Sequence, residues 1–340
     1  MEVTMTPTRI KILALVITVL SIASVLFLIS SHLPKALVDV TVSPKWVNQA
    51  QFAGVFVAQD KGIYTDHGLT VRVHEFTSSS TPLEDILKGR SQFGYMSAQE
   101  YLKAYSEGNS IVAVAAFYQV SPFVIASFPI KQISSPRDLK GKILGIKGGP
   151  GAESESIYSI LLNSAGLSLK DVSLKYLPFG TSELEDLQAG KVDVIGFYRT
   201  DQTYEFEHEG TAYTPIYPEQ YATGIYNDVL VVTKAFAAAH PEEVRNFIKS
   251  TQAGWSYAFA HKDAAVATTL SHVTSPVYTD AAKERFILDA SEPLIQPTPE
   301  TVIGSMDLAH WQRLYDVLHA KSYLMGTFDV KDAFTNKFLQ

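Results

Sequence analysis

A long apolar run near the start of the chain is the strongest hydrophobic feature of the sequence. Residues from Ile12 to Ile29 carry no charge, and Arg9 and Lys11 stand directly before them. A helix needs about 18 apolar residues to cross a bilayer, whereas the apolar core of a cleaved signal peptide has about 7 to 15. We therefore expect an uncleaved transmembrane anchor within residues 1–38, with a cleaved signal as the alternative. The basic residues before the run predict a cytoplasmic N-terminus and an extracytoplasmic body, in the periplasm or at the cell surface.

Beyond this run, strand-like and helix-like patterns alternate along the chain. Alternating β-formers predict a strand at 39–46, and apolar residues at helical spacing predict a helix at 51–61. A second strand is expected at 69–76, and the alternation continues as far as residue 118. Strands separated by helices favour an α/β fold with a parallel, doubly wound sheet.

A second α/β unit follows, and the chain then returns to the first. A capped turn at 134–141 leads into a strand at 142–146, and further strands are expected at 172–176 and 192–197. The expected lobes are a first lobe at 39–130, a second lobe at 131–224 and a return to the first lobe at 225–340. Two crossings between such lobes leave a cleft at the ends of the strands, where ligands bind in α/β folds.

Composition excludes several classes of function. The chain has 340 residues and no cysteine, so thiolate zinc sites, cysteine nucleophiles and redox couples are excluded. It carries 28 basic and 35 acidic side chains, a net charge of −7. This acidic balance argues against nucleic acid as a partner, because a surface that tracks phosphates needs a basic excess. No histidine pair has metal-site spacing, so we expect neither a metal nor a cofactor.

Four segments resemble one family of binding proteins. The run from Lys45 to Tyr64, closed by 68–71, looks like the opening of the thiamine-pyrimidine-precursor and alkanesulfonate type periplasmic binding proteins of ABC importers. The segments 135–142, 226–247 and 332–339 are similar to later parts of the same family. The resemblance implies a two-lobed, type II periplasmic binding protein fold that closes on a small ligand and delivers it to an ABC transporter permease.

The candidate ligand-binding residues lie where predicted strands end or helices begin. An aromatic ring there can stack on a flat heterocycle while amides read its edge, and glycine N–H groups can hold an anion or a ring edge. On this basis and on the resemblance, the candidates are Trp46, Asn48, Gln51, Met96, Ser97, Tyr118, Gly149, Gly151, Tyr198, Gln202, Tyr226 and Asp228. For each of them, core packing, helix capping or a glycine turn is the structural alternative. Glu153, after the glycines, is expected to cap the following helix.

The expected function is recognition of a small heteroaromatic solute such as a thiamine pyrimidine precursor. Relatives that bind pyrimidines or flavins tend to carry a glutamate where this chain has Gln202, which leaves the ligand open among pyrimidines, riboflavin, sulfonates and nitrate. A thiamine pyrimidine synthase is the enzymatic alternative, but those relatives carry a cysteine-rich motif that this chain lacks. A membrane-anchored sensor that acts through a separate partner is the third alternative.

Overall fold

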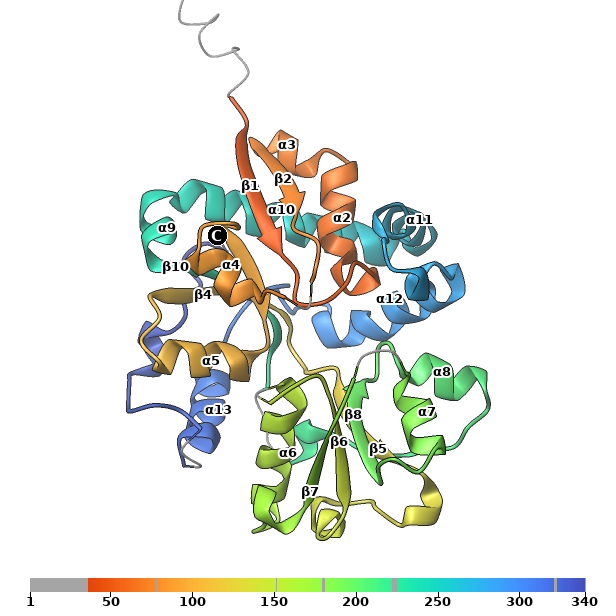
Figure 1. The fold of residues 1–340 in the computed structure, drawn as a ribbon. Helices are drawn as coiled ribbons and strands as arrows, with labels where there is room; N and C mark the ends of the chain where they lie inside the picture. Colours follow the sequence, from red (N-terminus) through yellow and green to blue (C-terminus); the bar gives the residue numbers. More distant parts are fainter. Residues whose placement is uncertain are drawn as a thin grey trace, which may run out of the picture. The chain divides into compact units, whose positions relative to one another are not determined.

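Two five-stranded sheets organise the chain from Val38 onward (Figure 1). The first sheet has the order β2-β1-β3-β10-β4, with β1 (Val38–Ser43), β2 (Leu69–Val73), β3 (Phe93–Met96), β4 (Ile111–Tyr118) and β10 (Asn227–Thr233). The second sheet has the order β7-β6-β8-β5-β9, with β5 (Phe123–Ser127), β6 (Ile143–Lys147), β7 (Ser173–Leu177), β8 (Val194–Tyr198) and β9 (Thr214–Ile216). We call the parts built on these sheets the first lobe and the second lobe.

The computed structural model describes residues 36–77, 79–150, 152–178, 181–221, 225–320 and 323–339. The anchor expected within residues 1–38 lies almost wholly outside these ranges. Inside them, no helix combines the length and the apolar character needed to span a bilayer.

Both sheets are mixed, whereas the sequence led us to expect parallel strands. β1 is parallel to β2 and β3, but β10 is antiparallel to both of its neighbours, β3 and β4. In the second sheet, β5 is antiparallel to β8 and β9. β10 is antiparallel to its neighbours because the chain returns from the second lobe and enters the first sheet from the opposite end. Hydrophobic periodicity carries no information about strand direction.

The crossing into the second lobe lies earlier than expected. β5 pairs with β8 from Phe123 to Ala126, so it belongs to the second sheet although the sequence placed it before the boundary at residue 130. The turn at Ser121 and Pro122 therefore separates the two sheets. The turn signal at 134–141 is stronger in the sequence, but it marks the entry to β6 rather than the crossing.

Helices cover both faces of the first sheet and flank the second (Figure 1). The first lobe contains α2 (Ala53–Asp60), α3 (Ile63–Asp66), α4 (Pro82–Leu87), α5 (Ala98–Ser106), α9 (Lys234–Ala239), α10 (Pro241–Ala260), α11 (Lys262–His272), α12 (Ala281–Ile295) and α13 (Leu308–Ala320). The second lobe contains α6 (Glu153–Ser164), α7 (Glu183–Gln188) and α8 (Thr203–His208).

The core of the first lobe follows from the alternation of side chains along its central strands. Every residue of β4 is buried, as expected for a strand covered on both faces. In β10, Leu230 and Val232 pack toward α2 and α10, whereas Val229 and Val231 pack toward α5 and α13. The second apolar cluster continues into the second lobe through residues such as Phe123 and Ile157.

Two glycines allow α2 and α10 to meet closely beneath the first sheet. A Cβ added to Gly254 would lie 1.9 Å from the carbonyl oxygen of Gly54, and one added to Gly54 would lie 2.4 Å from the Trp255 ring. A larger residue at position 254 would collide with the backbone of α2, and one at position 54 would collide with the Trp255 side chain. This contact fixes α2, which follows directly on the segment that carries Lys45 and Trp46.

Candidate functional site

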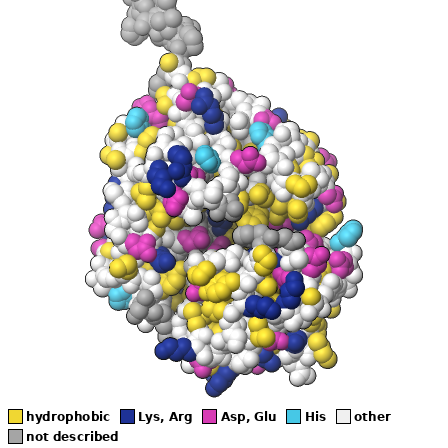
Figure 2. Space-filling model, in the orientation of Figure 1, with side chains coloured by type: hydrophobic (Ala, Val, Ile, Leu, Met, Phe, Trp, Pro, Cys, Tyr) yellow, Lys and Arg dark blue, Asp and Glu magenta, His cyan; other side chains and the backbone are white. Residues whose placement is uncertain are grey.

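A cavity of about 590 Å³ lies between the two lobes and is lined by residues from both. Figure 2 shows the hollow between the upper and lower halves of the molecule, with hydrophobic and acidic side chains around it. The first-lobe wall comes from the ends of β1 and β3, from the segment after β2 and from α4 and α5. The second-lobe wall comes from the ends of β6 and β8 and from the starts of α6 and α7. The cavity therefore lies where strand ends and helix starts converge, as the fold predicts.

Aromatic rings form much of the cavity wall. Trp46 packs against Phe76, with ring centroids 5.3 Å apart and planes tilted by 43°, and its indole N–H donates to the Tyr278 hydroxyl at 3.2 Å. On the second lobe, Tyr198 meets Phe123 edge to face at 6.2 Å. The cavity is also lined by the aromatic side chains of Phe76, Tyr95, Phe123, Phe197 and Tyr323. Rings on both walls can hold a flat ligand by stacking.

The charged side chains of the wall are mostly acidic. Five acidic residues line the cavity against three lysines, and the lysines already face carboxylates: Lys45 faces Glu153, Lys103 faces Glu107 and Lys147 faces Asp186. Burial raises the pKa of Glu183 to about 7, so this side chain holds a proton for part of the time near neutral pH. An anionic ligand would have to displace one of these pairs, whereas a neutral ligand with donor groups meets ready acceptors.

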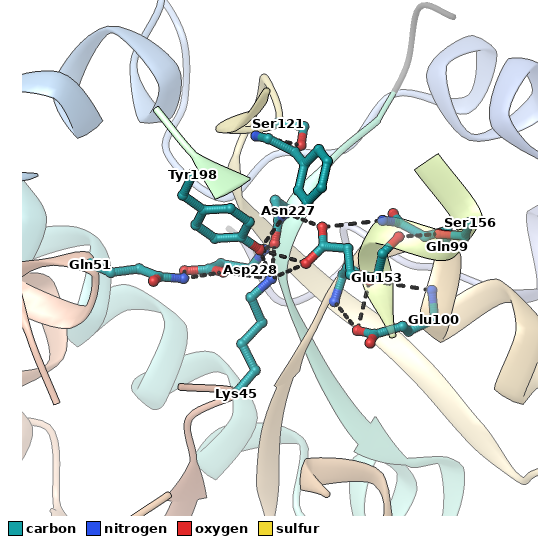
Figure 3. A network of polar contacts seen from close by, with 12 residues as sticks. Lys45, Gln51, Gln99, Glu100, Ser121, Glu153, Ser156, Tyr198, Asn227 and Asp228 are labelled. Carbon is teal, nitrogen blue, oxygen red and sulfur yellow. Dashed lines mark hydrogen bonds and ion pairs between the residues drawn. The ribbon is translucent and has the colours of Figure 1, made fainter. Parts of the chain in front are cut away.

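Lys45 occupies the centre of a buried polar network (Figure 3). Its ammonium lies 3.4 Å from Glu153 Oε2 and 3.6 Å from Asp228 Oδ1, and it also donates to the Tyr198 hydroxyl and to Asn227 Oδ1. Burial alone would lower the pKa of Lys45, but the combined charges of Glu153, Asp228 and Glu100 raise it above its ordinary value. The ammonium is therefore retained despite a side chain that is only 10% exposed.

Glu153 receives donors from both lobes, which corrects its expected role as a helix cap. Oε1 accepts from Gln99 Nε2 at 3.1 Å and from Asn227 Nδ2 at 2.8 Å. Oε2 accepts from the Tyr198 hydroxyl at 2.6 Å and from Lys45. Helix α6 has no side-chain cap, since its N-cap residue is Ala152, and the carboxylate of Glu153, the first helical residue, points across the cleft.

Asp228 lies beneath this network in an unusual backbone conformation. Its φ of 46° is in the left-handed region, which residues other than glycine rarely adopt. Gln51 Nε2 donates to both carboxylate oxygens, at 2.9 and 3.0 Å. Burial raises the pKa of Asp228 to about 6 although Lys45 opposes the shift. Backbone strain held by buried polar contacts is a common feature of binding and catalytic sites.

The structure places half of the twelve candidate residues on the cavity wall. These are Trp46, Gln51, Met96, Gly149, Tyr198 and Gln202. Both polar ends of Gln202 are engaged, since its Oε1 accepts from the Tyr198 N–H at 2.9 Å and its Nε2 donates to Asp201 at 2.8 Å. Gly151 lies outside the described residues.

The other five candidates lie behind the wall. Asn48 donates to the His272 carbonyl at 2.9 Å, and Ser97 caps α5 through Glu100. Tyr118 bonds Ser291 at 2.7 Å inside the first lobe, and the Tyr226 hydroxyl accepts from the Asp307 N–H at 2.8 Å. Asp228 reaches the cavity only through Lys45 and Gln51. None of these five side chains is among those that line the cavity, and Ser97 and Asp228 support lining residues through their bonds to Glu100, Lys45 and Gln51.

Four residues that contact Glu153 or belong to its network were not among the candidates: Lys45, Gln99, Glu153 itself and Asn227. Lys45 immediately precedes Trp46 at the same strand end, so strand-end position was a signal that could have found it. For Glu153 the sequence offered only an acidic residue in a first helical turn, which is typical of ordinary helices. Arg199, which directly follows β8, forms an ion pair with Glu219 at 2.8 Å. Among the described residues, no group of three or more His, Asp or Glu side chains is placed to hold a metal.

Comparison with known proteins agrees with the resemblance seen in the sequence. Residues 49–265 match the protein family described as NMT1/THI5 like, which is more than half of the chain. The chain belongs to this family. The predicted family membership is thereby confirmed.

Relatives in the family include binding proteins and an enzyme. The riboflavin-binding protein RibY of Chloroflexus aurantiacus is 26% identical, and the match covers 88% of this chain and 86% of RibY. The formylaminopyrimidine-binding protein of Halalkalibacterium halodurans is 24% identical, and the match covers 96% of this chain and 98% of that protein. A 4-amino-5-hydroxymethyl-2-methylpyrimidine phosphate synthase of Legionella pneumophila is 23% identical, and the match covers 64% of this chain and 68% of the synthase.

A solved structure shows the fold. The alkanesulfonate-binding protein SsuA of Xanthomonas axonopodis pv. citri, bound to MOPS, superposes with a TM-score of 0.65 at 16% identity, covering 88% of this chain and 99% of SsuA. The two-lobed periplasmic binding protein fold predicted for the body is therefore confirmed.

Proposed function

We propose that this protein is an extracytoplasmic solute-binding protein, tethered by its N-terminal segment, that delivers a small heteroaromatic compound to an ABC importer. The observation that carries the proposal is the aromatic-walled cavity of about 590 Å³ between two lobes. A cavity of this size suits a ligand of a few rings, and a site built from two lobes can close around such a ligand by a hinge motion.

The chemistry of the wall supports a neutral or amino-bearing heterocycle over a sulfonate. Trp46 and Tyr198 offer ring faces from opposite lobes, and the acidic excess offers acceptors for ring N–H and amino groups. The same charges disfavour an anion. Two relatives are named for binding riboflavin and formylaminopyrimidine, which are both heteroaromatic. A thiamine pyrimidine precursor is therefore the first ligand to test, and riboflavin is the second.

Binding rather than catalysis is the role that the site supports better. The charged groups near Lys45 are paired with one another across the two lobes rather than presented to a solute. The two relatives that match 88% and 96% of this chain, RibY and the formylaminopyrimidine-binding protein, are named as binding proteins, whereas the match to the synthase covers 64% of it.

Calorimetric titration of the full chain in detergent tests the ligand. We expect formylaminopyrimidine, hydroxymethylpyrimidine or riboflavin to bind at one site per chain, and taurine not to bind. Trp46→Ala should weaken that binding at least tenfold, because it removes a stacking face on the cavity wall. Tyr176→Ala is the matched control, since Tyr176 is an aromatic residue of β7 that is 41% exposed and outside the cavity wall. Binding of taurine alone, or equal binding by both variants, would contradict the proposed ligand class.

Export is tested separately by fusing alkaline phosphatase to the C-terminus. The enzyme is active only outside the cytoplasm, so we expect activity from the full chain and none after deletion of residues 1–38. Activity without that segment would contradict the proposed location.

A further inference from the structure

The Glu153 carboxylate uses almost all of its capacity to accept hydrogen bonds, as the carboxylate of a bound ligand would. Each of its oxygens accepts two donors: Gln99 and Asn227 on Oε1, and Tyr198 and Lys45 on Oε2. Two donors per oxygen come close to saturating the acceptor capacity of a carboxylate. Figure 3 shows the group at the meeting point of side chains from several elements.

Three of the four donors belong to the other lobe. Lys45 follows β1, Gln99 lies in α5 and Asn227 begins β10, all in the first lobe, whereas Glu153 and Tyr198 belong to the second. Gln99 and Asn227 are fully buried, and Lys45 is 10% exposed. These donors are separated from Glu153 by 54 to 108 residues of sequence, so only the approach of the lobes brings them together.

Two of the first-lobe donors, Asn227 and Lys45, are positioned by contacts within their own lobe. Asn227 Oδ1 accepts from Lys45 and from the Asp228 N–H at 2.7 Å, which turns its amide nitrogen toward Glu153. Lys45 is drawn to the same place by Asp228 at 3.6 Å. Contacts within the first lobe therefore hold the Lys45 ammonium and the Asn227 amide near a single point, and the Gln99 amide lies within 3.1 Å of the same carboxylate.

We propose that Lys45, Gln99 and Asn227 form a carboxylate-binding subsite of the first lobe, and that Glu153 is the tethered carboxylate that fills it when the lobes close. Glu153 thus acts as an internal ligand that favours the closed form before any solute arrives. A solute that bears its own carboxylate would compete with Glu153 for the subsite. This inference goes beyond the proposed function, because it concerns closure without solute and does not depend on the identity of the ligand.

Chemical rescue by acetate tests the subsite directly. Glu153→Ala removes the tethered carboxylate and leaves the three donors in place, so acetate should bind and raise the thermal midpoint of this variant in a concentration-dependent way. Wild-type protein should show no acetate-specific rise, since Glu153 occupies the subsite. Sodium chloride at matched ionic strength controls for general salt effects. Adding Lys45→Met to Glu153→Ala should abolish the acetate effect.

Closure is measured in the same variants by the distance between two spin labels. The chain has no cysteine, so Lys88→Cys, directly after α4, and Lys175→Cys on β7 accept labels at one exposed site in each lobe. Without solute, Glu153→Ala and the isosteric Glu153→Gln should both shift the distance distribution to longer values. The matched control is Glu155→Ala, which removes the same charge from α6. The Glu155 carboxylate accepts a hydrogen bond from the Tyr176 hydroxyl of its own lobe at 3.2 Å.

Two results would overturn the inference. One is a Glu153→Ala midpoint that responds to acetate no more than to chloride. The other is an unchanged interlobe distance in both Glu153 variants. Neither result bears on calorimetric binding of a heterocycle, so failure of this inference and failure of the proposed function can be told apart.

Discussion

The contact between α2 and α10 inside the first lobe differs in kind from the contact between Glu153 and the first lobe. The helix contact is apolar and so close that Gly54 and Gly254 admit no Cβ. The Glu153 contact is polar, and all of its groups can exchange their partners for water when the lobes part. The first kind of contact holds a lobe together permanently, whereas the second can be made and broken during a binding cycle.

The largest effect on the stability of the fold is expected from Gly254→Ala. Alanine in a helix interior gains about 1 kcal/mol of helix propensity over glycine. Here a Cβ would lie 1.9 Å from a backbone carbonyl oxygen, so we expect a net loss of about 3 kcal/mol in the free energy of unfolding. Urea denaturation measures the loss. Gly149→Ala is the control, because no atom lies within 4 Å of the added Cβ, and a similar loss there would contradict the steric account.

Lys45→Met should impair closure more than folding. The substitution leaves Glu153 and Asp228 facing each other without a cation, and separation of the lobes relieves this by admitting water. We expect solute affinity to fall by roughly 30-fold, about 2 kcal/mol, with a much smaller change in the urea midpoint. Lys249→Met, at an exposed position of α10, should change neither. An equal loss of unfolding stability and affinity in Lys45→Met would show that Lys45 belongs to the permanent core.

Tyr278→Phe tests a second contact between the lobes, with a smaller expected effect. The Tyr278 hydroxyl donates to Asp201 of the second lobe at 2.6 Å and accepts from Trp46 at 3.2 Å. Loss of a hydrogen bond to a charged group costs about 1.5 kcal/mol, so affinity should fall roughly tenfold. Tyr204→Phe removes a more exposed bond to Asp280, 3.0 Å long, and should change affinity less than threefold. The reverse order would contradict the importance of burial for these contacts.

Glu284→Gln probes the interior of the first lobe through pH, with the smallest expected effect. Burial raises the pKa of Glu284 to about 8, against 4.5 in the unfolded chain. The folded wild type therefore binds more protons than the unfolded chain between these values, and stability falls as pH rises. Glutamine keeps an acceptor for the Ala50 N–H and does not ionise. When the pH is raised from 5 to 6, the free energy of unfolding of the variant should increase by about 1 kcal/mol relative to that of wild type, as measured by urea denaturation.

The exposed Glu300→Gln is the control for this pH dependence. It should show no relative gain, because the Glu300 side chain is exposed to water in the folded chain as it is in the unfolded chain. A gain equal to that of Glu284→Gln would contradict burial as the cause.

The sequence predicted the elements better than their long-range partners. The strand β1, which Lys45 and Trp46 follow, and the glycine turn before α6 can be predicted from local alternation and turn residues, and the residues after β1 and in this turn border the cavity. The antiparallel entry of β10 and the pairing of β5 with the second sheet were missed, because direction and pairing depend on distant strands. Tyr118 and Tyr226 end up in the core, since an aromatic residue at a strand end suits packing as well as stacking.

The Glu153 network could not be found from local pattern for the same reason. Its members are separated by up to 182 residues, and each one alone has an ordinary local role. Glu153 begins a helix, Gln99 lies in the first turn of another, and Asn227 begins a strand. Only the closed arrangement of two lobes turns these residues into one site.

The most direct test of the account is the interlobe distance of the chain labelled at Lys88→Cys and Lys175→Cys, recorded with and without a saturating heteroaromatic solute. Formylaminopyrimidine is the first solute, and riboflavin replaces it if calorimetry shows that riboflavin binds. The account predicts a broad distribution without solute, containing open and closed forms, that narrows to the shorter distance with solute. Identical distributions in both samples, at saturation shown by calorimetry, would contradict closure around a bound solute.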